Sequence, residues 1–110
     1  MSEQSYLVVE VSGALTVDQH RALVAVSDPK LVEIGLGTGF GAERVLKFFA
    51  SVSKPALAQL KALAQRLTDA HRVTGVKISR DGVEIGSMHA DDVQKIEQFI
   101  IRTLDRLDAD

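Results

Sequence analysis

Apolar residues alternate with polar ones in two short stretches, which is the spacing of a half-buried β-strand. Residues 6–11 form the first predicted strand, and one of its faces would carry Leu7, Val9 and Val11. Residues 31–36 alternate in the same way and form the second predicted strand. Both stretches are rich in β-branched residues, which favours strands further.

A third pattern predicts a β-hairpin over residues 73–85, where two apolar runs flank Asp81-Gly82. Asp-Gly favours a type I′ turn, whose twist matches that of the strands it joins. With these two residues as the loop, Ile78 faces Ile85, and the pair covers one face of the hairpin.

Residues 17–26 are predicted to be a short helix. Thr16 and Gln19 have the spacing of a capping box, in which each side chain accepts from a backbone amide of the first turn. The helix should end before Pro29, because the residue preceding a proline disfavours helical geometry. Residues 23–26 are also compatible with an extended conformation.

Residues 42–52 and 54–71 space their apolar residues three or four apart, which is the period of an amphipathic helix. Ser53 is a candidate N-cap for the second segment, and Pro55 is tolerated in a first turn. The two segments are therefore either two helices or one long helix kinked at Pro55.

The last predicted helix covers residues 90–107. Asp91 and Asp92 are expected in its first turn, where negative charge is favourable. Its buried stripe would consist of Val93, Ile96, Ile100, Leu104 and Leu107, with Phe99 beside it.

The predicted order of elements is β-α-β-α(α)-β-β-α, which indicates an α+β fold. We expect a sheet of about four strands, mixed or antiparallel, with helices packed mainly on one face. The chain would form a single domain over residues 1–110, with residues 1–5 and 108–110 disordered.

Composition narrows the function classes. The 110 residues carry a net charge of −2, so no broad basic field is present to bind nucleic acid. The absence of cysteine excludes disulfides and thiolate zinc sites. No run of about 18 apolar residues predicts a membrane span, and the polar N-terminus lacks the basic region of a signal peptide. A cytoplasmic protein is the expectation.

The most distinctive motif is a run of alternating glycines after the second strand, Gly35, Gly37, Gly39 and Gly41. Its "VEIGLGTGFGA" is close to the first motif of Rossmann-like S-adenosylmethionine methyltransferases, and Gly37-x-Gly39-x-x-Ala42 fits the dinucleotide fingerprint. Glycine lets backbone amides approach a ligand closely. These residues are therefore the candidate cofactor or nucleotide loop.

Three observations oppose a cofactor loop. The chain has room for only about four strands, and no acidic residue ends a strand about 20 residues further on. The later strands form a hairpin, so they are antiparallel. A Walker A loop is excluded because Ala42-Glu43 follows Gly41. The main prediction is therefore no cofactor, with the glycines acting as a permissive turn between strand and helix.

No catalytic or metal-binding constellation is apparent. His20, His71 and His89 are scattered, and none has the spacing of a zinc motif. Glu84 with Asp91-Asp92 lacks the alternating ligands of a calcium loop. We therefore expect a protein without enzymatic activity and without a resident metal.

Apolar surface suggests a partner instead. Phe48 and Phe49 are adjacent, so one must turn away from the helical stripe that buries the other, and Ile101 falls off the stripe of the last helix. Such residues often serve partners or self-association. Phe48, Phe49 and Ile101 are the interface candidates, for a protein partner or a homo-oligomer.

The order of motifs resembles that of the small effector-associated domains of bacterial conflict systems, most closely the effector-associated constant component type. The matching pieces are the glycine turn, "ALAQLKALAQRL", "VKISRDGVEIG" and "ADDVQKIEQFI", within residues 32–100. The resemblance implies a non-enzymatic adaptor that couples components of a bacterial defence system, with no catalytic residues. The alternative hypothesis is a regulatory domain that binds a small ligand or nucleotide through residues 35–41.

Overall fold

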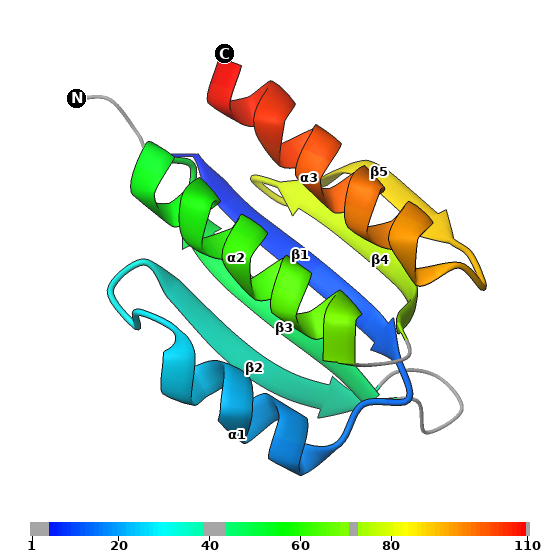
Figure 1. Ribbon diagram of the computed structural model, residues 1–110. Helices are drawn as coiled ribbons and strands as arrows, with labels where there is room; N and C mark the ends of the chain where they lie inside the picture. The colour runs from blue at the N-terminus through cyan, green and yellow to red at the C-terminus, as the bar shows by residue number, and fades with distance from the viewer. Residues whose placement is uncertain (1–4, 39–43, 71–72, 110) are drawn as a thin grey trace.

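A computed structural model describes residues 5–38, 44–70 and 73–109 (Figure 1). Its elements, in chain order, are β1 (Tyr6–Gly13), α1 (Val17–Val26), β2 (Val32–Thr38), β3 (Arg44–Ser51), α2 (Lys54–Ala70), β4 (Val73–Arg80), β5 (Val83–His89) and α3 (Val93–Ala109). The predicted α+β class is confirmed.

The strands form one sheet in the order β2-β3-β1-β4-β5, and every neighbouring pair is antiparallel. The described part of the sheet thus has five strands, one more than predicted. The helices α1, α2 and α3 lie side by side across one face of the sheet, as predicted (Figure 1). Strands β2 and β5 form the two edges.

The fifth strand is β3, and the predicted helix over residues 42–52 is wrong. Burial alternates along β3: Leu46, Phe48 and Ala50 are buried, whereas Val45, Lys47 and Phe49 are only partly buried. The helical prediction failed because Val45 and Phe49 are also apolar, so that apolar residues on both faces of a strand imitated a helical stripe. The alternative of one kinked helix is wrong for the same reason.

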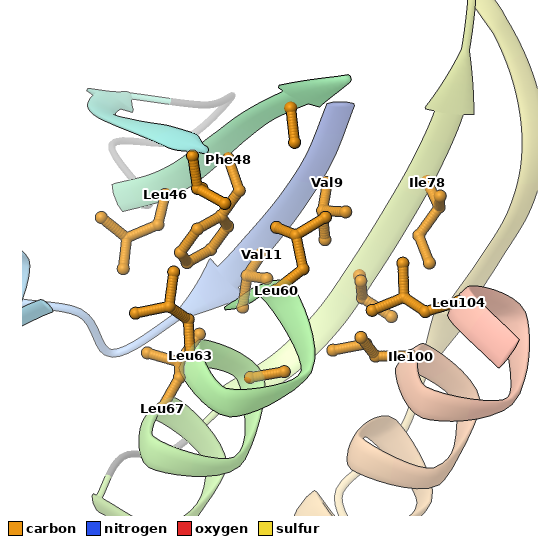
Figure 2. Close-up of a cluster of buried hydrophobic side chains, with 14 of the residues drawn as sticks. Val9, Val11, Leu46, Phe48, Leu60, Leu63, Leu67, Ile78, Ile100 and Leu104 are labelled. Carbon is orange, nitrogen blue, oxygen red and sulfur yellow. The ribbon is translucent and has the colours of Figure 1, made fainter. Parts of the chain in front are cut away.

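The core fills the space between the helices and the sheet. Figure 2 shows side chains of α2 and α3 meeting those of β1, β3 and β4. The buried stripe predicted for α3 is confirmed at Ile96, Ile100, Leu104 and Leu107. The predicted face of β1 is confirmed as well, since Leu7, Val9 and Val11 are at most 3% exposed.

The predicted helix starts at Thr16 and Ser53 are confirmed. The Gln19 N–H donates to Thr16 Oγ1 at 3.2 Å, and the Thr16 N–H donates to Gln19 Oε1 at 2.7 Å, so α1 has a complete capping box. The Leu57 N–H donates to the Ser53 carbonyl at 2.9 Å, and α2 follows. α3 differs from expectation: it begins at Val93, so that Asp91 and Asp92 precede its first turn. Asp92 accepts from the Gln94 N–H at 2.9 Å instead.

The β4–β5 hairpin is confirmed, but its predicted register is correct only near the turn. Arg80 faces Val83, as expected of a two-residue Asp81-Gly82 loop. A bulge then shifts the pairing, so Ile78 faces Gly86 and not Ile85. Ile85 is consequently 44% exposed.

Candidate functional site

The candidate site is the face of the sheet opposite α1, α2 and α3, which we call the uncovered face. The strand register arranges its residues in three rows that run across the five strands. From β2 to β5, these rows are Glu33–Phe49–Val8–Ser79–Glu84, Gly35–Lys47–Glu10–Lys77–Ser87 and Gly37–Val45–Ser12–Gly75–His89. The face therefore has an apolar centre in one row and charges in the next.

The middle row is held together by a shared carboxylate. Glu10 on the central strand β1 contacts Lys47 Nζ of β3 and Lys77 Nζ of β4, each at 3.4 Å. Cross-strand pairs of opposite charge stabilise a sheet modestly when they are exposed. The three groups together leave one positive charge near the centre of the uncovered face.

Aromatic side chains lie beside this charged row. The rings of Tyr6 and Phe49 are 6.4 Å apart between centroids, and the Tyr6 side chain is 48% exposed. Tyr6 is fixed by the hairpin turn, because its N–H donates to Asp81 Oδ1 at 2.8 Å. Val8 and Phe49 are half-buried neighbours on β1 and β3. Together with the exposed Tyr6 they form a partly exposed apolar patch on the sheet surface.

The far row contains a shallow hollow around Gly75. Ser12 Oγ and His89 Nδ1 lie 2.7 and 2.8 Å from the point where a Cβ on Gly75 would stand. Both side chains thus rest on the glycine backbone, and among the described residues no hydrogen bond joins them. Lys77, Ser87 and Glu84 line the same hollow. The side chains around this hollow are therefore mostly polar, in contrast to the apolar patch in the first row of the uncovered face.

The predicted glycine site is divided by the structure. Gly35 and Gly37 lie within β2 on the uncovered face, whereas Gly39 and Gly41 lie outside the described residues. A strand, β3, follows the glycine segment where a nucleotide loop would open a helix. Among the described residues, the first element after this segment is therefore a strand, which does not offer the helix N-terminal amides that the ligand hypothesis requires.

The three predicted interface residues lie in three different environments. Phe48 is 3% exposed and belongs to the core, so it takes no part in the uncovered face. Its neighbour Phe49 points to that face and packs near Tyr6. Ile101 is half-buried on α3, on the helix side of the sheet. Only Phe49 is thus a member of the candidate site.

The other residues considered for chemistry do not converge. His20 Nε2 contacts the Ile34 carbonyl at 3.3 Å, His89 lies at the hollow, and His71 lies outside the described residues. Asp92 caps α3. In residues 5–38, 44–70 and 73–109, no three His, Cys, Asp or Glu side chains cluster as metal ligands would.

Several residues of the uncovered face were missed from the sequence: Tyr6, Val8, Glu10, Val45, Lys47 and Lys77. The available signal was the alternation of Val45, Lys47 and Phe49, which becomes visible once residues 44–51 are treated as a strand. A helix over residues 42–52 does not align Lys47 with Glu10, and only the strand pairing of β3 with β1 brings the two side chains together.

Comparisons of the chain with protein-family models, curated proteins and solved structures found no match. Among the described helices, none combines the length and the apolar character that crossing a membrane requires.

Proposed function

We propose that this chain is a non-catalytic protein–protein interaction module, in which the uncovered face pairs with a second copy of the chain. The observation that supports the proposal is the partly exposed apolar patch of Tyr6, Val8 and Phe49 next to the Lys47–Glu10–Lys77 row. An antiparallel sheet with one face on the core normally turns polar residues to water on the other. Apolar residues concentrated there are typical of interaction surfaces.

The register makes the face complementary to itself. Consider two copies whose uncovered faces are stacked, with a two-fold axis between the two faces. The axis is parallel to the strands and passes over the gap between β1 and β3. It stacks each β1 on the partner copy's β3, so that Lys47 lies over Glu10 and Phe49 lies over Val8 of the other copy. Each contact occurs twice, and opposite charges meet in both. A self-complementary arrangement of this kind favours a second copy as the occupant.

An adaptor role is consistent with such a dimer, because two copies present every other surface of the chain twice. Two binding surfaces on one particle raise the avidity for a multivalent partner. The resemblance to effector-associated domains supports the same role and suggests coupling between components of a bacterial defence system. Catalysis is not part of the proposal.

The test is the oligomeric state of the purified chain, measured by light scattering over a range of concentrations. We expect a dimer for the native chain and a monomer for Phe49→Glu, which places a charge in the centre of the stacked faces. The matched control is Val83→Glu. Val83 is 66% exposed and pairs with Arg80, away from the uncovered face, so this variant should remain dimeric. Circular dichroism should show that both variants are folded.

A native chain that stays monomeric at high concentration would overturn the pairing. Dimers that persist in Phe49→Glu would also overturn it, because association would then use another surface. A different protein that binds the native monomer but not Phe49→Glu would replace the second copy as the occupant of this face.

A further inference from the structure

The second surface of interest is the outer edge of β5. The Ala90 N–H donates to the Thr74 carbonyl at 3.1 Å, so Ala90 directs its backbone groups toward β4. Antiparallel pairing alternates, and therefore Ser87 and His89 direct their N–H and C=O groups away from β4. Within the described part of the sheet, no strand pairs with this edge.

Helix α3 and strand β5 lie side by side (Figure 1). A hollow lined by cations lies between them. Its apolar lining comes from Met88 and Phe99, and its charges come from Lys95, Arg102 and Arg106 of α3. None of the three cations forms a salt bridge within the described residues. Three uncompensated positive charges beside open backbone groups make a surface that attracts anions.

The charges of α3 are segregated. Asp105 forms a salt bridge with Lys61 of α2, on the side of α3 that faces away from β5. At 100° per residue, Glu97 and Asp108 share that flank, whereas Lys95, Arg102 and Arg106 share the flank next to β5. The helix therefore presents its positive flank, and not its negative one, to the edge of the sheet.

We propose that the β5 edge binds an extended acidic segment of a partner protein as an additional strand. Ser87 and His89 supply the backbone hydrogen bonds of this β-augmentation. Side chains at alternate positions of the added strand, about 6.8 Å apart, fall on the α3 side. Arg102 and Arg106, one turn apart, are separated by about 6 Å along the helix, so carboxylates at alternate positions match them.

Two observations favour an acidic partner at β5 over pairing of two copies through β5 and over strand addition at β2. If two copies paired through β5, their α3 helices would lie side by side, and the positive flanks would repel each other. The opposite edge, β2, has its outward groups partly occupied, because Val32 N–H donates to Asp28 O and His20 Nε2 contacts Ile34 O. The β5 edge is thus the more open of the two.

The proposed strand addition uses the outward backbone of Ser87 and His89 and the cations of α3, whereas the proposed dimer uses side chains of β1 and β3. The two tests can therefore fail independently. The probe is a labelled synthetic peptide in which glutamate alternates with valine, and binding is measured by fluorescence anisotropy. The reference peptides are one with lysine in place of glutamate and one of the same composition with its glutamates clustered. A fourth peptide has N-methyl groups on alternate amides, which removes the donors that face β5.

We expect the alternating acidic peptide to bind and the lysine peptide not to bind. Charge reversal at both Arg102 and Arg106 should lower the affinity at least about tenfold, whereas the control Arg66→Glu on exposed α2 surface should change it little. Ser87→Pro, which removes an outward N–H, should abolish binding, and Ser87→Ala, which keeps it, should not.

The proposal is overturned if the alternating acidic peptide does not bind. It is also overturned if the clustered or the N-methylated peptide binds as tightly as the alternating acidic peptide. Binding would then result from charge alone, without strand pairing. The N-methylated peptide gives this answer even if Ser87→Pro fails to fold.

Discussion

The ring of Phe99 in α3 lies directly against the backbone of Gly86 in β5. A Cβ at Gly86 would stand 2.9 Å from Phe99 Cζ, closer than carbon atoms pack. Gly86 also occupies the position that the bulge places opposite Ile78. This contact sets how closely α3 approaches the sheet edge and thereby positions the cationic hollow.

Gly86→Ala should destabilise the fold by about 1–3 kcal/mol, because the new methyl group forces Phe99 and α3 outward. Gly37→Ala is the matched control. A Cβ at Gly37 meets no atom within 4 Å, so alanine there should be neutral or stabilising by up to about 1 kcal/mol. Urea unfolding of the two variants checks the difference. Equal stabilities would show that the Phe99 ring adjusts without cost.

The sequence was sufficient to predict elements in which the spacing of apolar residues fits only one kind of secondary structure. In β1, Leu7, Val9 and Val11 alternate with partly polar positions, and α3 has one clean stripe. In β3, by contrast, Phe48 is in the core and Phe49 is on the uncovered face. Local spacing alone does not distinguish such a strand from an amphipathic helix, because Val45 and Phe49 make its second face apolar as well.

The hairpin shows a second limit of sequence reasoning. Asp81 and Gly82 have φ of 53° and 84°, the positive values of a type I′ turn, and this local chemistry fixes the pairing of Arg80 with Val83. The bulge between Glu84 and Gly86 depends instead on tertiary packing, because it places Gly86 against the ring of Phe99. Because the candidate site depends on such register, its rows could not be derived from the sequence.

The two adjacent phenylalanines should respond differently to truncation. Phe48→Ala removes a core side chain that is 3% exposed and should cost about 3–5 kcal/mol of unfolding free energy. Phe49→Ala should cost about 1 kcal/mol or less when the protein is dilute, because the ring lies on the sheet surface. Denaturant unfolding at low protein concentration measures both values. Similar losses would place both rings in the core.

The capping box of α1 gives a prediction that is independent of function. Thr16→Ala removes the acceptor of the Gln19 N–H and should lower stability by about 1 kcal/mol, while Thr16→Ser keeps a hydroxyl at the same position and should lose much less. Thermal unfolding followed by circular dichroism compares the two. An alanine variant as stable as the serine variant would mean that tertiary contacts alone hold the start of α1.

The proposed dimer predicts charge rescue between Lys47 and Glu10. Lys47→Glu places the introduced carboxylate over Glu10 of the other copy, and Glu10→Lys places two cations together, so each single change should weaken association about tenfold. The double variant restores opposite charges both within the chain and across the two-fold axis, and it should recover much of that loss despite the new contact with Lys77. Sedimentation equilibrium measures the dimer dissociation constants. If the double variant associates no better than the worse single variant, the stacking of β1 on the partner copy's β3 is wrong, because that stacking places each exchanged charge over an opposite charge of the other copy.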